Sequence, residues 1–300
     1  VPVVEPLIHV KRFEVTGVTR LSPDELKAIL EPWEGKELSI ADMQKPAEAI
    51  AGAIRAKGYP LAQAFLPPQR VDGGTLEIRV QEGVVDGSAG IGGIVTSGAD
   101  KRIRPEVVAR VLAEGAPAGQ PLDGEALERS LLVANELPGV KKIKANLAPG
   151  SQPGTTQVEA QVEEGRLVTG SVWADNYGNH YTGSGRLSVA ANLNSPTGYG
   201  DLWTLTASKS SGMTSGRFGA IVPVGSRGGR VGASYSEVSM DFAGQVIPVN
   251  LDGKARVASV FASYPLHRSA TSNVLLSGSY DAKSLQHNIE GSTDRDRQIS

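Results

Sequence analysis

The sequence predicts an α+β region followed by an all-β region, and three observations support this. Apolar residues recur at helical spacing within residues 1–165, whereas over residues 166–300 they alternate with polar residues. A period of two indicates β-strands with one apolar and one polar face. The segment Val80-Gln81-Glu82-Gly83 recurs 82 residues later as Val162-Glu163-Glu164-Gly165. A repeat of this period indicates two tandem β-α-α-β-β domains, over 1–83 and 84–165, with antiparallel strands over 166–300.

Composition and charge narrow the functional classes. The chain has 300 residues, no cysteine and 36 glycines, and its net charge is −2. Residues 1–165 carry −5 and residues 166–300 carry +3, and neither value matches the strongly basic surface that nucleic acid requires. No run of about 18 apolar residues occurs, which excludes a transmembrane helix. The first residues also lack the basic and apolar parts of a signal peptide, as expected if the numbering starts after cleavage.

The first repeat contains clear start and stop signals. Residues 8–15 alternate as a strand, and Ser22-Pro23-Asp24-Glu25 begins a helix. Ser22 is the expected N-cap, Pro23 the first helical residue, and Glu25 the residue that closes a capping box. A longer helix is expected from Ser39 to Gly58, followed by strands at 59–66 and 75–81.

The second repeat follows the same order. We expect a strand near 91–96, helices over 105–114 and 124–137, and strands over 140–147 and 155–163. Core packing and helix capping explain most of these positions without any functional role.

The clearest strand after residue 165 is 186–194. Leu187, Val189, Ala191 and Leu193 share one face, and Arg186, Ser188, Ala190, Asn192 and Asn194 share the other. A soluble sandwich and a membrane barrel with a wet lumen both produce this alternation. In a barrel, Arg186 and Arg217 would be lumen-facing.

About seven strands are expected after residue 165, at 166–176, 181–194, 202–210, 215–224, 229–238, 255–266 and 272–284. The polar segment 291–300 is expected to contain no closing strand. Short turns at 195–201, 225–228 and 267–271 alternate with longer loops at 239–254 and after 285, which is typical of outer-membrane barrels. Seven strands are too few to close such a barrel, because about eight is the minimum.

Several segments, in their order, carry a resemblance to a known family. In the first repeat they are Ser22-Pro23-Asp24-Glu25-Leu26, Gly35-Lys36-Glu37-Leu38-Ser39, Lys57-Gly58-Tyr59-Pro60-Leu61-Ala62 and Leu76 to Gly83. In the strand region they are Asn194 to Asp201, Tyr264-Pro265-Leu266 and Tyr280-Asp281. Together they resemble the two-partner secretion transporters of the hemolysin secretion/activation type, over nearly the whole chain.

The resemblance implies two POTRA domains in the periplasm and a transmembrane β-barrel in the bacterial outer membrane, beginning near residue 166. It also implies a translocation pore that secretes a partner exoprotein, recognised through the amino-terminal secretion domain of that exoprotein. The family's Val-Arg-Gly-Tyr/Phe loop motif and its N-terminal plug helix have no counterpart here. We expect this if the sequence is a piece of a longer protein.

The resemblance also suggests where a client would bind. In the POTRA topology the second strand lies at the edge of the sheet, where an extended chain can add as a further strand. The candidate client-binding residues are Tyr59, Leu61, Gln63 and Phe65 in the first domain, and Val140, Lys142, Ile143, Lys144 and Ala145 in the second. Lysines in the second strand either attract a client or prevent aggregation of an exposed edge.

No catalytic, cofactor or metal site is expected. The four histidines have no metal-ligand spacing, and the glycines of 87–93 precede a strand rather than the helix of a dinucleotide site. The expected partners are an exoprotein and outer-membrane lipid, and not nucleic acid. Two alternatives stay open, an outer-membrane assembly factor (insertase) and a soluble β-rich binding module.

Overall fold

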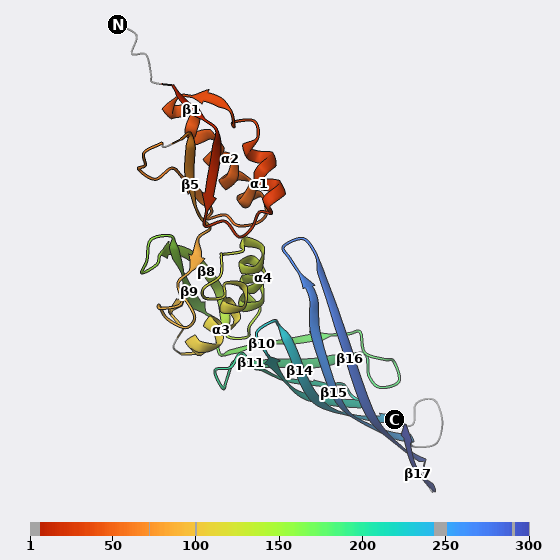
Figure 1. Ribbon diagram of the computed structural model, residues 1–300. Helices are drawn as coiled ribbons and strands as arrows, with labels where there is room; N and C mark the ends of the chain where they lie inside the picture. The colour runs from red at the N-terminus through yellow and green to blue at the C-terminus, as the bar shows by residue number, and fades with distance from the viewer. Residues whose placement is uncertain (1–6, 72, 100, 243–250, 290–291, 300) are drawn as a thin grey trace. The chain divides into compact units, whose positions relative to one another are not determined.

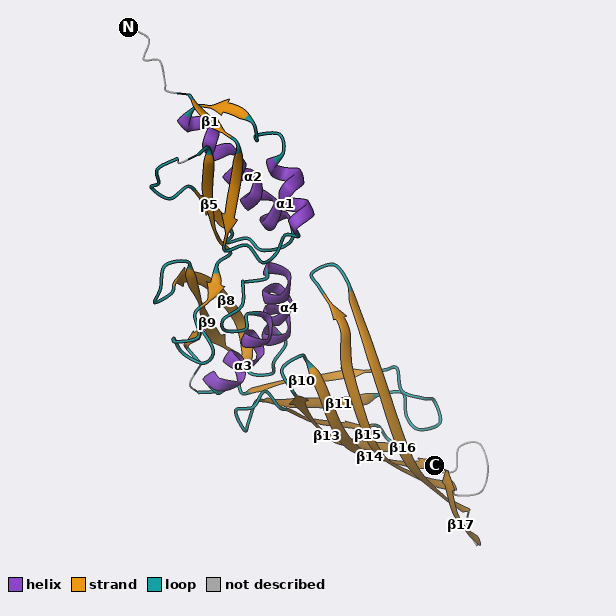
Figure 2. Ribbon diagram, in the orientation of Figure 1, coloured by secondary structure: helices purple, strands orange, loops and turns teal. Residues whose placement is uncertain are grey.

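The structure, a computed structural model, describes residues 7–71, 73–99, 101–242, 251–289 and 292–299 (Figure 1). Contacts divide the chain into two compact units. The first comprises Val1–Val95, Leu112–Ser130 and Ala145–Ala160, and the second comprises Thr96–Val111, Leu131–Lys144 and Gln161–Ser300. The predicted fold class, an α+β region followed by antiparallel strands, is confirmed (Figure 2). The domain boundaries at residues 83 and 165 stay a prediction.

The described residues of the first repeat form two helices and five strands. The helices are α1 (Pro23–Leu30) and α2 (Ile40–Ala56), and the strands are β1 (Ile8–Val10), β2 (Arg12–Thr16), β3 (Lys36–Leu38), β4 (Gln63–Phe65) and β5 (Thr75–Gln81). The capping box of Ser22 and Glu25 is present, with both reciprocal hydrogen bonds. The helix starts were therefore predicted correctly from capping chemistry alone.

Two strand predictions in this repeat need correction. The strand expected over 8–15 divides at Lys11, because the Lys11 N–H donates to the Gly74 carbonyl at 2.7 Å instead of continuing the β1 ladder. The strand expected over 59–66 shrinks to β4. Its first half forms a turn in which the Ala62 N–H donates to the Tyr59 carbonyl at 3.2 Å, and Pro60 has no N–H to offer to a sheet.

The first repeat is held by one apolar core. β2 pairs with β5 in parallel and β4 pairs with β5 antiparallel, so β4 lies at the edge of this three-stranded sheet. Helix α2 buries Ile50 and Ile54 completely, as its helical spacing predicts. Leu76 and Ile78 of β5 lie in the same core.

The second repeat contains β6 (Val84–Val85), β7 (Ile94–Ser97), α3 (Pro105–Gly115), α4 (Gly124–Asn135), β8 (Val140–Pro149) and β9 (Thr155–Glu164). Both expected helices are present. The strand expected from residue 91 begins at Ile94, because Ile91 and Ile94 bridge each other across a tight turn. In the sheet the order is β6-β9-β7, and β8 pairs with β9.

The repeat extends to individual hydrogen bonds. Glu82 accepts from the backbone N–H groups of Thr19 at 2.6 Å and Arg20 at 2.9 Å. Glu164, 82 residues later, accepts from the N–H groups of Lys101 at 3.0 Å and Arg102 at 2.8 Å. In each copy a carboxylate at the end of the last strand therefore fixes the loop that leads into the first helix. This explains the recurring Glu-Gly pair as a structural device.

We expect Glu82→Ala to lower the free energy of unfolding of this repeat by about 2–4 kcal/mol. Glu82 is only 5% exposed and also accepts from the Thr19 hydroxyl, so truncation leaves several partly buried donors without an acceptor. Glu82→Gln keeps one acceptor oxygen and should cost about half as much. Denaturant titration followed by circular dichroism measures both values. Glu48→Ala, at an exposed position of α2, is the control, and an equal loss in Glu82→Ala and Glu48→Ala would contradict this account.

The region after residue 165 is one antiparallel sheet of eight strands in sequence order. The strands are β10 (Val168–Asp175), β11 (Arg186–Asn194), β12 (Leu202–Lys209), β13 (Met213–Val224), β14 (Gly229–Phe242), β15 (Leu251–Arg268), β16 (Asn273–Ile289) and β17 (Ser292–Ile299). β10 and β17 lie at the two ends of the sheet. None of the helices in the described ranges is long and apolar enough to span a membrane.

The strand prediction for this region was wrong in three respects. The described residues of this region form eight strands rather than seven, because β17 pairs with β16 within the segment expected to contain no strand. β14, β15 and β16 also extend into the stretches expected to be loops. β11 begins only at Arg186, because a loop stabilised by the hydrogen bond from the Gly178 N–H to the Ser184 carbonyl precedes it. Backbone pairing continues where apolar alternation stops, so alternation underestimates strand length.

Candidate functional site

The eight-stranded sheet has one face that is apolar over much of its area. Val189 pairs with Ala207, Leu193 with Trp203, and Leu205 with Phe218, so these side chains share a face. We call this the apolar face. Its large side chains are exposed, with 40% exposure for Val189 and 53% for Leu205. A sheet that shows such side chains to its surroundings requires an apolar environment there.

The opposite face, which we call the polar face, carries both predicted lumen-facing arginines. Arg217 pairs with Thr206 and Ser236, and its guanidinium donates to the Ser234 hydroxyl at 3.1 Å. Arg186 forms an ion pair with Asp175 at 3.1 Å. The predicted division of strand 186–194 into two faces agrees with this register. That the polar face lines a pore stays a prediction.

The apolar face becomes polar toward one end of its strands. Phe218, Tyr235, Ala258 and Ala282 form one row across β13 to β16. The next row away from the 225–228 turn contains Glu237 and Arg256, and the row after that contains Lys254. Charged residues of the apolar face in these strands therefore begin two residues beyond the Phe218 row.

The candidate client-binding residues of the first repeat lie at or near a short edge. Gln63 and Phe65 belong to β4, which has only three residues. Tyr59 and Leu61 precede it in the turn, and the Arg20 guanidinium stacks on the Tyr59 ring at 4.7 Å from the ring centroid. A client strand would find few backbone partners at this edge.

The candidates of the second repeat lie on the longer strand β8, which spans 10 residues. The Ile143 N–H donates to the Asn135 side chain at 2.7 Å, so this N–H points away from β9 and is already used. Because alternate N–H groups of a strand point the same way, the Ala145 N–H also points away from β9. Val140 begins the strand, and its N–H donates to the Leu137 carbonyl at 3.0 Å.

The lysines of β8 are exposed, and one of them is paired. Lys141 forms an ion pair with Glu163 of β9. The Lys141 ammonium lowers the pKa of Glu163 by hydrogen bonding and by its charge, and the charges of Lys142 and Lys144 lower it further. Lys142 and Lys144 themselves project as exposed basic groups. This charge distribution fits both expectations for the lysines, attraction of a client and protection of an edge.

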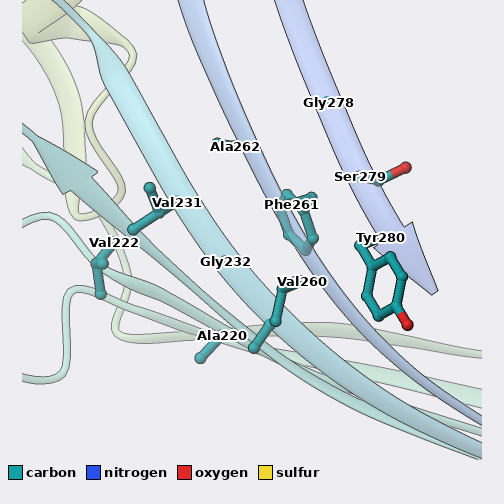
Figure 3. A pocket seen from close by; sticks show the side chains of 11 residues that line it. Ala220, Val222, Val231, Gly232, Val260, Phe261, Ala262, Gly278, Ser279 and Tyr280 are labelled. Atoms are coloured by element: carbon teal, nitrogen blue, oxygen red, sulfur yellow. The ribbon is translucent and has the colours of Figure 1, made fainter. Parts of the chain in front are cut away.

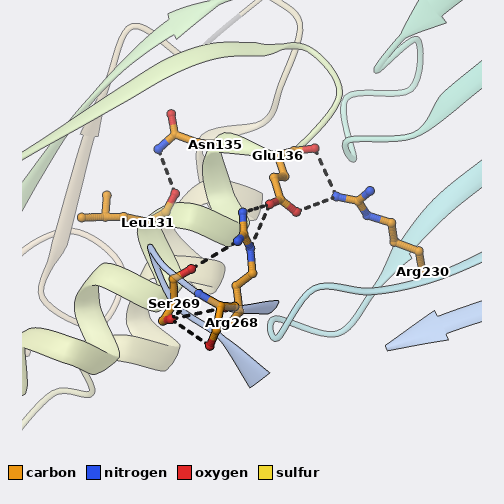
Figure 4. Close-up of polar contacts among 7 residues, drawn as sticks. Leu131, Asn135, Glu136, Arg230, Arg268 and Ser269 are labelled. Carbon is orange, nitrogen blue, oxygen red and sulfur yellow. Dashed lines mark hydrogen bonds and ion pairs between the residues drawn. The ribbon is translucent and has the colours of Figure 1, made fainter. Parts of the chain in front are cut away.

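A charged cluster that the sequence did not predict centres on Glu136, directly after α4 (Figure 4). Its carboxylate accepts from Arg268 at the end of β15, with the Nε atom at 3.0 Å, and from Arg230 at the start of β14 at 3.3 Å. Arg230 also donates to the Glu136 carbonyl oxygen. One carboxylate therefore connects the end of α4 to two turns of the sheet.

A second contact involves the 195–201 turn. The Arg104 guanidinium stacks on the Tyr199 ring at 4.0 Å from its centroid, and the Arg104 N–H donates to the Gly198 carbonyl at 2.9 Å. Stacking with a charge near an aromatic face contributes about 0.5–2 kcal/mol. Residues in or beside the three predicted short turns, Tyr199, Arg230 and Arg268, thus contact residues of 96–144 within the second unit. The sequence does not indicate these contacts, because the two residues of each contact lie 94 or more positions apart in the chain.

We expect Glu136→Arg to release the turns at 225–228 and 269–272, because it puts three cations together. Hydrogen–deuterium exchange of these turns should rise by about tenfold or more, since breaking a paired charge network costs at least 1–2 kcal/mol. Glu128→Arg, at an exposed position of α4, is the control. The triple variant Glu136→Arg/Arg230→Glu/Arg268→Glu restores opposite charges and should restore slow exchange. Slow exchange in the single variant would mean that the cluster does not hold these turns.

Comparison with known families identifies both regions of the chain. Residues 8–83 match the family model described as POTRA domain, ShlB-type. Residues 154–293 match the model described as Haemolysin secretion/activation protein ShlB/FhaC/HecB. Together these matches confirm the predicted resemblance to the haemolysin secretion/activation family. They place the chain in the bacterial outer membrane, with its POTRA region in the periplasm.

Curated relatives and solved structures agree with this assignment. The chain is 30% identical over 208 residues to the outer membrane transporter CdiB of Escherichia coli, covering 69% of this chain and 33% of the relative. It is 30% identical over 178 residues to the heme/hemopexin transporter protein HuxB of Haemophilus influenzae, covering 59% of this chain and 30% of the relative. The chain thus spans about a third of the length of these relatives.

The fold follows a solved member of the family. The structure of CdiB from Escherichia coli matches 99% of this chain with a TM-score of 0.75 at 24% sequence identity, and the match covers 55% of that protein. This likeness confirms the predicted fold of POTRA followed by β-barrel strands.

Proposed function

We propose that the protein containing this chain is an outer-membrane pore that secretes a partner exoprotein. The observation that carries the proposal is the eight-stranded antiparallel sheet with an exposed apolar face and a polar face, joined to a POTRA region. In a barrel, such a sheet meets lipid with the apolar face and encloses water with the polar face. Residues 1–83 and 84–165 would be the two POTRA domains, and 166–300 the first part of the barrel.

Client recognition is assigned here mainly to the edge of β8. Addition of an extended segment to a sheet edge uses backbone hydrogen bonds, which tolerate different client sequences. β8 has 10 residues and β4 has three, so β8 provides more partners. The Ala145 N–H is the first candidate donor, because the Ile143 N–H is bound to Asn135. Lys142 and Lys144 would attract an acidic client, whereas Tyr59, Leu61, Gln63 and Phe65 would contribute a shorter second edge.

The alternatives account for less of the structure. A soluble β-rich module would not leave Val172 at 70% and Leu205 at 53% exposure on one face, because exposed apolar patches of this kind cause aggregation in water. An insertase shares the POTRA and barrel organisation, so it is the alternative that an experiment must separate.

Deletion of the gene distinguishes a secretion pore from an insertase that assembles other outer-membrane barrels. Cells without the protein should retain the exoprotein in the periplasm, while the amounts of other outer-membrane barrels stay at wild-type levels. Both quantities are measured by immunoblotting of the medium, the periplasm and the outer membrane. Normal secretion together with loss of other barrels would overturn the proposal in favour of an insertase.

A further inference from the structure

The side of β8 that faces away from β9 is closed at one position by a side chain of α4. Asn135 is the last residue of α4, and its Oδ1 atom accepts from the Ile143 N–H at 2.7 Å. Its Nδ2 atom donates to the Leu131 carbonyl at 2.8 Å (Figure 4). The two bonds fix the orientation of the carboxamide, because its oxygen only accepts and its nitrogen only donates. Asn135 therefore gives Ile143 the acceptor that a neighbouring strand would otherwise supply.

The other end of this edge is closed by a proline. Backbone groups of alternate strand residues point to the same side. The residues of β8 that point away from β9, beginning with the one bound to Asn135, are Ile143, Ala145, Leu147 and Pro149. The Ala148 carbonyl accepts from the Thr156 hydroxyl of β9 at 2.9 Å, which agrees with this alternation. Pro149 ends β8 and has no N–H. An added strand would therefore meet the N–H groups of Ala145 and Leu147.

The first repeat closes its own edge at the equivalent position. Arg55, in the last turn of α2, donates to the Ala62 carbonyl at 2.9 Å. Ala62 directly precedes the edge strand β4 and lies four residues after Gly58. Ile143 likewise lies four residues after Gly139, and in both copies a proline follows five or six residues later. The same position is covered by a donor in one copy and by an acceptor in the other, so the common feature is the closed edge and not a particular residue.

We propose that Asn135 limits the client-binding edge of β8 at one end, as Pro149 does at the other, so that an added client strand pairs with Ala145 and Leu147 alone. The inference rests on the proposed function, in which an extended client segment adds to β8. Pairing with these residues gives about four backbone hydrogen bonds. Each contributes only modestly to affinity, because it replaces hydrogen bonds to water. A chain that passes through a pore has to leave each site to which it pairs, so a short edge that releases the client serves transport better than a long one.

Opening either end of the edge should make the client bind more tightly. Asn135→Ala exposes the Ile143 N–H, and Pro149→Ala supplies a new N–H at the other end. We expect the affinity to rise about fivefold in each variant, mainly through slower dissociation, because each adds about one hydrogen bond to the added strand. The full-length protein is held in mild detergent, and binding of the secretion domain of the exoprotein is followed by surface plasmon resonance. Pro149→Ala leaves α4 unchanged, so it tests the proposal even if Asn135→Ala perturbs that helix.

Hydrogen–deuterium exchange of the Ile143 amide distinguishes a closed edge from a general change in stability. In the wild-type protein this amide should exchange slowly with and without the client, since Asn135 already binds it. In Asn135→Ala it should exchange fast in the free protein and slowly in the complex. Fast exchange that the client does not slow would mean that Asn135 has only a structural role, and would overturn the proposal.

Two controls leave both ends of the edge closed. Asn135→Asp keeps an acceptor oxygen for the Ile143 N–H and should bind the client like the wild-type protein. Tyr280→Ala changes the apolar face, where Val222, Val260 and Tyr280 line a concavity of about 780 Å³ (Figure 3). Its affinity should also stay at the wild-type value. A loss of affinity in Tyr280→Ala would mean that the client adheres to the apolar face and not to β8, which would contradict the proposal.

The same measurements distinguish a failure of this proposal from a failure of the proposed client site. Wild-type affinity in Asn135→Ala and Pro149→Ala, together with lost binding in Ala145→Pro, would overturn the limit on the edge and retain strand addition at β8. Wild-type affinity in all three variants would reject β8 as the client site, and this proposal with it.

Discussion

Proline at Ala145 is expected to abolish binding of the client while the second repeat stays folded. The Ala145 N–H points to the same side of β8 as the Ile143 N–H, away from β9. Removing it leaves the β8–β9 ladder intact and deletes a donor that an added strand would use. We expect affinity to fall by about tenfold or more, from the lost hydrogen bond and the steric block of the ring. Binding of the secretion domain of the exoprotein is measured by calorimetry.

The neighbouring positions provide the controls. Ala145→Ser keeps the N–H and should bind normally. Ile143→Pro is a poor test, because it breaks the hydrogen bond to Asn135 and the side chain of Ile143 is only 6% exposed. Lys142→Gln/Lys144→Gln tests the charge separately and should slow association in low salt. Wild-type affinity in a folded Ala145→Pro variant would exclude strand addition at this edge.

Arginine at Val189 is expected to lower the stability of the membrane-inserted protein by about 2–4 kcal/mol, the cost of a basic side chain near the bilayer midplane. Val189 lies on the apolar face, between Val172 of β10 and Ala207 of β12. Stability is measured by urea titration of folding into lipid vesicles, with the shift in mobility between folded and unfolded protein as the signal.

Ala190→Arg is the matched control for this prediction. Ala190 is the next residue and pairs with Ser171 and Thr206 on the polar face, where an arginine keeps its hydration. We expect its cost to be well below that of Val189→Arg. Equal costs for the two variants would mean that the faces are assigned incorrectly.

Local chemistry predicted the elements whose signals lie within a few residues. Ser22 and Glu25 form the expected capping box, and α2 occupies the range expected for it, with Ser39 as its N-cap. The strands were predicted less well where pairing rather than side-chain pattern decides, as in β17, whose partner is β16. The turn before β4 also escaped prediction, since apolar Leu61 and Ala62 look like strand residues although Pro60 interrupts the backbone donors.

The sequence likewise predicted only part of the candidate site. Strand alternation placed Arg186 and Arg217 on one face, and the register agrees. The Glu136 cluster could not be predicted, because it joins residues 94 and 132 positions apart. The sequence also did not indicate that the Ile143 N–H donates to the Asn135 side chain. Because of this hydrogen bond, Ala145 rather than Ile143 is the residue of β8 to mutate.

The central claim is that the protein is a pore that secretes an exoprotein. Transport of a polypeptide across a bilayer tests this claim most directly. The full-length protein is reconstituted into liposomes with its POTRA region outside, the unfolded exoprotein is added outside, and the fraction protected from protease is measured. We predict that protected exoprotein accumulates with the wild-type protein and that Ala145→Pro prevents its accumulation. Absence of protected exoprotein with the wild-type protein, together with faster insertion of an unrelated barrel into the same liposomes, would contradict the account.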